Sequence, residues 1–334
     1  MKTRRPTQSG RRNFIKTLGG ATAAMAALPA LASGQAAAPR KAGAKYMGDF
    51  AAPKLPKVRI AMIGVGARGT GHASQLASIE GTEIVAISDL YEDLAKRADQ
   101  RVQAKGHKPK LYFGDKNLYR TMLAEVKPDM VVIATPWEEH APMGVAAMQA
   151  GAHTFIETPI AVTMDEMWQL VNTSEETGRH CMHMENVCYG REELLYLNMV
   201  RQGIIGELLH GEASYIHDLR DQMKQVERGT GSWRTYHYIR RDGNLYPCHG
   251  LGPVAQYMSL ARTEDTFGRL SSFSSPSKVR AQYAKANFPA DHKWNKETFI
   301  AGDINTSVIK TALGRTIMVQ WDEQTPRPYS RHNL

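Results

Sequence analysis

Glycines at fixed spacing give the clearest chemical signal in this sequence. Gly64, Gly66 and Gly69 form the pattern G-x-G-x-x-G directly after the apolar run Val58–Ile63. In dinucleotide-binding folds the first glycine permits a tight turn, the second lets the backbone approach a pyrophosphate, and the third lets a helix pack close to the strand. Free N–H groups at the start of that helix then face the phosphates. The pattern predicts a dinucleotide site after the first strand.

An acidic residue at the end of the next apolar run supports this interpretation. The run Glu83–Ser88 is followed by Asp89, which falls about 20 residues beyond the glycines, where the adenosine ribose is held in such folds. A carboxylate there also repels a 2′-phosphate, so NAD is favoured over NADP. The alternative is a glycine turn in another α/β protein, in which Asp89 only caps a helix.

The positive charge of the chain is concentrated at its N-terminus. The 334 residues have a formal net charge of +9, but residues 1–32 contain six basic residues and no acidic one, so the remainder carries only +3. The apolar content of 42% and charged content of 22% are typical of a globular protein. The length suits two domains. We therefore predict neither a nucleic-acid partner nor a membrane span in the mature protein.

The N-terminal segment resembles a twin-arginine (Tat) export signal. Arg11 and Arg12 precede the Ala-rich segment Thr17–Leu28, and Ala30–Ala32 supplies a small-x-small cleavage site. We predict a signal peptide over residues 1–32, recognised by the Tat export machinery, and a linker over 33–56. This implies a periplasmic or secreted protein. The alternative is a disordered basic tail.

Apolar runs and amphipathic segments alternate from residue 57 to residue 189. The expected strands are Val58–Ile63, Glu83–Ser88, Asp129–Thr135, His153–Glu157 and His180–Asn186. This rhythm predicts an α/β fold with an N-terminal Rossmann domain, a doubly wound parallel sheet, over residues 57–189. Ligands bind such sheets at the carboxyl ends of the strands. Those ends carry Gly64–Gly69, Asp89, Pro136–His140, Glu157-Thr158 and Asn186.

The sequence after residue 189 differs in composition and in hydrophobic periodicity, and we assign 190–334 to a second domain. Gly206–Leu219 and Asn305–Trp321 contain period-two stretches typical of a sheet with one covered face. The segment Arg220–Gly252 is rich in His, Arg, Tyr and Trp, which suits a sugar site, although a solvated loop is the alternative. Cys181, Cys188 and Cys248 form no C-x-x-C pair, so we predict no metal site.

Eight strings resemble the glucose–fructose oxidoreductase/inositol dehydrogenase (Gfo/Idh/MocA) superfamily and, within it, glycoside hydrolase family 109. That family comprises NAD-dependent α-N-acetylgalactosaminidase-like enzymes. The strings are MIGVGARG (Met62–Gly69), TPWEEH (Thr135–His140), HCMHMENVCY (His180–Tyr189), NMVRQGIIGE (Asn198–Glu207), HDLR (His217–Arg220), SWR (Ser232–Arg234), YPCHGLGP (Tyr246–Pro253) and RPYSRHN (Arg327–Asn333). The resemblance implies a second α/β domain built on a large open, mainly antiparallel sheet, and it makes a homo-oligomer possible.

The resemblance also implies roles for residues that match the family strings. The positions implied to bind NAD are Gly64, Gly66, Arg68, Gly69, Asp89, Trp137, Glu138, Glu139, His140, Glu157, Thr158, Asn186 and Tyr246. The positions implied to bind the sugar are Tyr215, Arg234, Tyr246, Pro247, Cys248, His249 and Tyr329. We predict that His249 is the base, because an unperturbed imidazole titrates at about pH 6.5. Tyr246 is the second candidate for proton transfer, and a purely structural His249 is the alternative.

The mechanism implied by the resemblance is redox-neutral. Oxidation at C3 of the sugar acidifies C2, the glycosidic oxygen is eliminated, water adds, and C3 is reduced again, so the flanking carboxylate pair of ordinary glycosidases is not needed. Three features depart from the family pattern. Glu157-Thr158-Pro159 lacks the lysine of the superfamily's Glu-Lys-Pro, Cys248 replaces a common threonine, and the chain stops soon after RPYSRHN. The alternatives are therefore an NAD-dependent sugar dehydrogenase and a truncated, inactive NAD- or glycan-binding protein.

Overall fold

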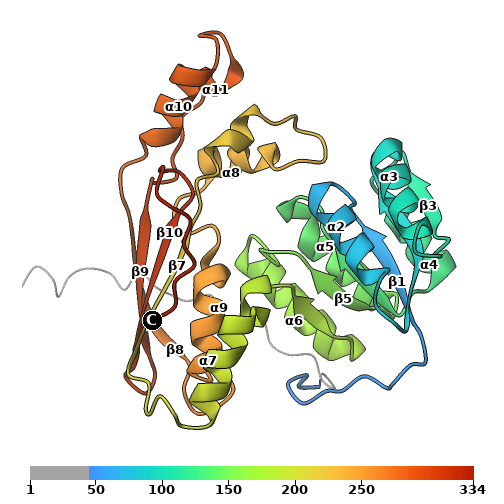
Figure 1. Ribbon diagram of the computed structural model, residues 1–334, viewed down its shortest axis with the longest axis horizontal. Coiled ribbons are helices and arrows are strands. Elements are labelled where there is room, and N and C mark those ends of the chain that lie inside the picture. The colour runs from blue at the N-terminus through green and yellow to red at the C-terminus, as the bar shows by residue number, and fades with distance from the viewer. Residues whose placement is uncertain (1–44) are drawn as a thin grey trace, which may run out of the picture. The chain divides into compact units, whose positions relative to one another are not determined.

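A computed structural model describes residues 45–334, which belong to one compact unit (Figure 1). The predicted signal peptide and the first part of the predicted linker lie outside the described residues. Within residues 45–334, every helix is too short or too polar to cross a membrane.

Six parallel strands form the first sheet, in the order β3-β2-β1-β4-β5-β6. The strands are β1 (Val58–Ile63), β2 (Thr82–Asp89), β3 (Lys110–Phe113), β4 (Met130–Ile133), β5 (His153–Ile156) and β6 (Cys181–His183). The helices that connect them are α2 (Ala67–Leu76), α3 (Glu92–Gln103), α4 (Leu118–Val126), α5 (Trp137–Gln149) and α6 (Met164–Thr177). This order is that of the doubly wound dinucleotide-binding fold, which confirms the predicted fold class.

Side chains of β1 alternate between two hydrophobic layers, one on each face of this sheet. Ile60 and Met62 pack with residues of α2 and α3, whereas Ala61 and Ile63 pack with residues of α4, α5 and α6. Because both faces of the strand are covered, its sequence is continuously apolar rather than alternating.

Two strands at the edges of the first sheet differ from expectation. The strand β3 was not predicted, because it is only four residues long and buries Tyr112 alone. The last strand was predicted over His180–Asn186 but ends at His183, since only three of its residues pair with β5. The chain then turns into the short 3₁₀ helix η1 (Asn186–Tyr189), where the Glu185 carboxylate accepts a hydrogen bond from the N–H of Val187.

Four strands form the second sheet, in the order β7-β10-β9-β8. They are β7 (His210–Ile216), β8 (Phe267–Ser274), β9 (Asn305–Thr311) and β10 (Thr316–Asp322). Two of the three pairings are antiparallel, and β7 runs parallel to β10. The helix α9 (Pro247–Tyr257) packs on β7 and β10 through a shared apolar cluster (Figure 1). Three strands thus fall in the two stretches predicted from period-two alternation.

Aromatic side chains from distant segments form a separate cluster beside this second sheet. Its fully or nearly fully buried members include Trp137, Tyr215, Tyr238, Tyr246, Trp294 and Trp321. The remaining elements are α7 (Arg191–Arg201), η2 (Arg220–Lys224), η3 (Ser232–Arg234), α8 (Thr235–Arg240), α10 (Val279–Asn287) and α11 (Lys293–Lys296). Because Trp137 begins α5 of the first sheet, this cluster brings the predicted sugar residues to the strand ends of the dinucleotide-binding half.

Candidate functional site

The glycine turn has the geometry that a dinucleotide fingerprint requires. Gly64 has a φ of +81°, which is accessible to glycine at no steric cost. A Cβ at Gly69 would lie 2.0 Å from the carbonyl oxygen of Gly64, so only glycine permits α2 to start this close to β1. The turn therefore has the backbone shape that fits the pyrophosphate of NAD. On the Gly66 side of the turn, the carbonyl oxygen of Gly229 lies 3.1 Å from the position of an added Cβ.

Asp89 lies at the carboxyl end of β2 beside this turn. Its carboxylate accepts hydrogen bonds from the N–H of Val65 at 2.8 Å and from the N–H of Tyr91 at 2.9 Å. Burial raises the pKa of the Asp89 carboxyl, although both N–H donors oppose that shift. The carboxylate therefore joins the glycine turn to the start of α3, on the side where the fingerprint expects an adenosine ribose.

A loop from the second half of the chain covers the start of α2, and we call residues 226–231 the covering loop. The carbonyl oxygen of Gly229 accepts a hydrogen bond from the N–H of Ala67 at 3.0 Å. Arg228 forms two hydrogen bonds of 2.6 Å to the carboxylate of Asp93 in α3, and its guanidinium lies 4.8 Å from the Tyr91 ring centroid. One N–H at this helix start is thus held by protein.

The end of β4 leads into the predicted segment Trp137–His140, whose side chains lie in different surroundings. Trp137 is buried in the aromatic cluster, while Glu138 is exposed and lies 3.3 Å from Nε2 of His237. Glu139 is half-buried. The ring nitrogens of His140 contact the carbonyl oxygens of Thr135 and Pro159 at 2.8 and 2.7 Å. His140 therefore connects the loops that follow β4 and β5.

Glu157 at the end of β5 is brought together with Arg68 from the glycine turn. Its carboxylate lies 2.6 Å from Nε2 of His72 and 3.8 Å from Nε of Arg68. Burial alone would raise the pKa of Glu157, but the hydrogen bonds from His72 and from the N–H of Thr158 lower it overall. The Thr158 hydroxyl donates to the carbonyl of Met184 at 3.4 Å.

His249, the predicted base, is hydrogen-bonded to a buried carboxylate. Its Nδ1 lies 2.8 Å from the carboxylate of Glu185, and the two residues are 7% and 5% exposed. Burial would raise the pKa of Glu185, but the hydrogen bond from His249 lowers it overall. A carboxylate only accepts hydrogen bonds, so in the neutral ring Nδ1 carries the proton and Nε2 the lone pair. This hydrogen bond fixes the orientation of the His249 ring.

Two tyrosines enclose the His249 ring. The Tyr246 ring is stacked on it at a centroid distance of 5.1 Å and an interplanar angle of 8°, and the Tyr215 ring meets it edge-on at 4.5 Å. Burial raises the pKa of both phenols, so both are neutral at physiological pH. Arg234 donates a hydrogen bond from Nε to the Tyr246 hydroxyl at 2.8 Å. Trp137 contacts the Tyr246 ring at 5.0 Å, which joins this group to the cofactor half.

The remaining predicted sugar and cofactor residues lie around this group. Tyr329 is exposed and meets His217 edge-on at 4.9 Å, and His217 in turn bonds the Tyr215 hydroxyl at 2.8 Å. Pro247 is exposed at the first position of α9. Asn186 accepts a hydrogen bond from Arg331 at 3.3 Å.

Sequence reasoning missed three residues of this site, namely Glu185, His217 and Arg331. Glu185 precedes the predicted Asn186 at the end of the last strand, so the strand-end rule that selected Asn186 also applies to it. His217 and Arg331 lie inside the strings HDLR and RPYSRHN. The guanidinium of Arg331 lies 4.7 Å from the Tyr215 ring centroid, a contact between segments far apart in the chain that spacing could not reveal.

The parallel sheet with its glycine turn defines an NAD-binding protein with a Rossmann fold. Residues 58–184 match the oxidoreductase family with an NAD-binding Rossmann fold, and residues 189–334 match the C-terminal domain of glycosyl hydrolase 109. The chain belongs to glycosyl hydrolase family 109. It is a glycoside hydrolase that uses NAD as its cofactor.

Relatives along the whole chain support this assignment. A glycosyl hydrolase family 109 protein of Akkermansia muciniphila is 58% identical, and the match covers 98% of this chain and 72% of the relative. A Shewanella oneidensis protein named alpha-N-acetylgalactosaminidase is 52% identical over 97% of this chain and 71% of its own length. The solved structure of myo-inositol 2-dehydrogenase from Lactobacillus plantarum shares the fold, with a TM-score of 0.64 at 17% identity over 83% of this chain and 73% of that one.

Proposed function

We propose that this chain hydrolyses α-N-acetylgalactosaminides by a redox-neutral route. The substrate is suggested by the 52% identical relative named alpha-N-acetylgalactosaminidase. Bound NAD supplies a reversible hydride acceptor for C3 of the sugar. The oxidised C3 acidifies the proton at C2, and elimination of the glycosidic oxygen, addition of water and reduction of C3 complete the cycle without net redox change.

The buried pair of His249 and Glu185 is the observation that carries the proposal. The C2 step needs a base whose free nitrogen faces the sugar, and the Glu185 carboxylate at 2.8 Å holds the proton of His249 on Nδ1. Nε2 is then the atom that takes the C2 proton. Glu185 also stabilises the imidazolium that forms, because it places a negative charge beside the ring.

The two tyrosines and Arg234 position the substrate in this proposal. Arg234 donates to the Tyr246 hydroxyl, so it fixes that phenol beside the His249 ring. A neutral phenol can donate a hydrogen bond to a sugar hydroxyl or pass a proton to it. Aromatic faces and edges around the ring also exclude water from the reacting carbons.

The triplet Glu157-Thr158-Pro159 favours the glycosidase over a plain sugar dehydrogenase. A threonine hydroxyl does not titrate near neutral pH, so Thr158 cannot replace the lysine that acts on the reacting hydroxyl in the superfamily pattern. In this structure the Thr158 hydroxyl donates to a backbone carbonyl, and the Glu157 carboxylate pairs with His72. Neither group replaces a general acid or base here.

The experiment is turnover of p-nitrophenyl α-N-acetylgalactosaminide by the purified full chain. The proposal expects release of p-nitrophenol while NADH absorbance stays flat. If NADH instead rises in step with the sugar consumed, the chain is a net dehydrogenase. Release from other nitrophenyl glycosides, and none from this one, would refute the proposed substrate.

We also propose that the protein is exported by the Tat machinery and self-associates. Export is supported by the pair Arg11-Arg12, which lies outside the described residues. Self-association is supported by large apolar side chains of β8, since Leu270 is 65% and Phe273 is 75% exposed. Cell fractionation of an Arg11→Lys/Arg12→Lys variant tests export, and light scattering of a Leu270→Lys variant tests association.

A further inference from the structure

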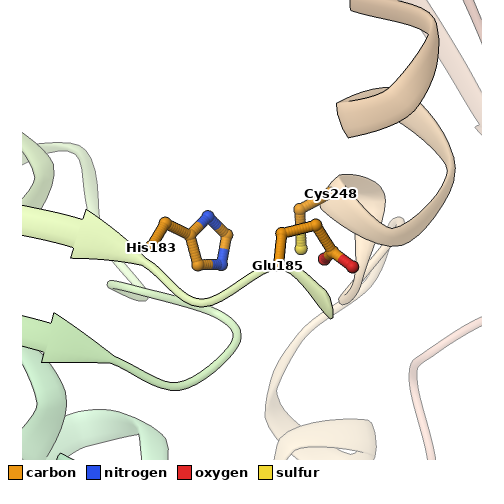
Figure 2. Close-up of side chains that lie close together, drawn as sticks. All are labelled: His183, Glu185 and Cys248. Atoms are coloured by element: carbon orange, nitrogen blue, oxygen red, sulfur yellow. The ribbon is translucent and has the colours of Figure 1, made fainter. Parts of the chain in front are cut away.

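Three potential metal ligands from two parts of the chain converge beside the His249–Glu185 pair. His183 ends β6, Glu185 follows it, and Cys248 lies in the first turn of α9. One ligand atom from each of these side chains lies within 4.8 Å of the other two. Figure 2 shows the three side chains directed into the same space between the strand end and the helix start.

One of these ligand atoms has unused bonding capacity, and a second is shared with His249. Nε2 of His183 is buried without a hydrogen-bond partner in the part of the chain that the structure describes, and Oε2 of Glu185 is buried at 2.8 Å from Nδ1 of His249. Glu185 as a whole is 5% exposed. A buried polar atom without a partner is costly, because it has lost its hydrogen bonds to water. The convergence of His183 with Glu185 and a thiol therefore needs an explanation beyond packing.

We propose that His183, Glu185 and Cys248 form a site for a divalent transition metal such as Zn²⁺. An imidazole nitrogen, a carboxylate oxygen and a thiolate sulfur are the ligands that Zn²⁺ takes in proteins. In a tetrahedral zinc site the ligand atoms lie roughly 3.5 Å apart, so modest side-chain rotations close the site. The Cys248 thiol releases its proton to solvent as the sulfur–metal bond forms, and water completes the fourth position.

Cys248 decides the chemical class of the ion. Mg²⁺ and Ca²⁺ prefer oxygen ligands, whereas a thiolate with an imidazole selects zinc, cobalt or copper. A threonine at this position, which the family pattern commonly has, would supply only a hydroxyl oxygen. The site is thus a property of this chain's own cysteine.

Metal binding acts on the proposed catalytic pair through the shared carboxylate. Glu185 contacts Nδ1 of His249 at 2.8 Å, and an ion at Oε2 withdraws charge from the same carboxylate. His249 then shares with the ion the acceptor that fixes the orientation of its ring. This consequence rests on the proposed function, and it predicts that Zn²⁺ slows turnover.

The test is titration of the purified full chain with Co²⁺, followed by its thiolate-to-cobalt charge-transfer absorption. We expect one Co²⁺ per chain, displaced by Zn²⁺. Cys248→Thr and Cys248→Ser should abolish the absorption, and His183→Gln should weaken binding about tenfold or more. Cys181→Ser is the matched control and should retain it. Thermal melts confirm that the variants are folded.

Absence of the absorption in the wild type, or its persistence in both Cys248 variants, would overturn the site. Zn²⁺ should also lower glycoside turnover of the wild type and of Cys181→Ser at the concentration that fills the site. Full turnover at saturating Zn²⁺ would refute the effect on His249. A chain without any glycoside turnover would refute the proposed function, and the cobalt titration would still decide on the site.

Discussion

The glycine turn and the His249 group, which consists of His249 with Glu185, Tyr215, Tyr246 and Arg331, are constructed in opposite ways. At the glycine turn, the closest contact joins backbone positions of one short segment, since a side chain is kept out by the 2.0 Å approach of Gly69 to the Gly64 carbonyl. Around His249, side chains come from the turn between β6 and η1, from β7, from the residue before α9 and from the C-terminal segment. A backbone site is encoded locally, whereas a side-chain site exists only after the two halves have packed together. The two regions should therefore fail in different ways when mutated.

The largest effect is expected from His249→Ala. Loss of a general base lowers turnover by about 10²–10⁴-fold, whereas NAD content should stay unchanged because the glycine turn is untouched. Turnover of p-nitrophenyl α-N-acetylgalactosaminide and the NAD released on denaturation measure the two effects. His210→Ala, an exposed histidine of β7, is the control. An unimpaired His249→Ala enzyme would remove the base assignment.

Gly69→Ala, in contrast, should lower both the stability of the fold and the binding of NAD. Its Cβ would meet the Gly64 carbonyl oxygen, a backbone atom that cannot move aside cheaply. We expect a loss of about 3 kcal/mol in the free energy of unfolding and little copurified NAD. Gly71→Ala on the same helix is the matched control, because no atom lies within 4 Å of its added Cβ. Equal stability of the two variants would contradict the packing argument.

The aromatic cluster around Trp137 should lose stability in mild acid. Burial lowers the pKa of His237 to about 4, and its ring lies 4.2 Å from that of Trp137. The unfolded chain takes up this proton at about pH 6.5. Between these values the unfolded state holds the extra proton, so the free energy of unfolding falls as the pH drops.

The expected loss from His237 is about 3 kcal/mol between pH 6.5 and pH 4. Denaturant unfolding across this range measures it. In His237→Asn, which cannot titrate, the decline should be smaller by that amount. An identical pH dependence of the two proteins would show that His237 is not held neutral.

The smallest effect is expected at the covering loop, which contacts the start of α2 and α3. Arg228→Ala removes two hydrogen bonds to Asp93, which is worth about 1 kcal/mol for an exposed pair. The loop should then open more readily, and exchange of bound NAD for labelled NAD should quicken about fivefold. Arg101→Ala, another exposed arginine, on α3, should leave the exchange rate unchanged. Unchanged exchange in Arg228→Ala would show that the loop does not control access.

The sequence was sufficient to predict the parallel sheet, its glycine turn and part of the second sheet. The apolar run of β1, the glycines and the period-two strands follow from local rules, so the fold class could be predicted. The exceptions were β3 and the end of β6, whose few paired residues leave no periodic signal, and β8, whose side chains are almost all exposed and show no alternation of buried and exposed positions.

The side-chain site was predictable only where a residue stood at a strand end or in a family string. His249 and Tyr246 came from such a string. Their partner Glu185 also lies in a family string and next to a strand end, but its role was missed because it depends on a 2.8 Å contact across 64 positions of sequence. The convergence of Cys248 with His183 was likewise invisible, since metal-ligand spacing in sequence is informative only when ligands are neighbours in the chain.

The most direct test of the account is hydrolysis in D₂O with analysis of the released N-acetylgalactosamine by NMR. Removal of the C2 proton by His249 predicts that each released sugar carries one solvent deuterium at C2. The free sugar incubated with the same enzyme serves as the control for exchange after release. A product that retains its original C2 hydrogen would show direct hydrolysis at C1 and would contradict the redox-neutral route.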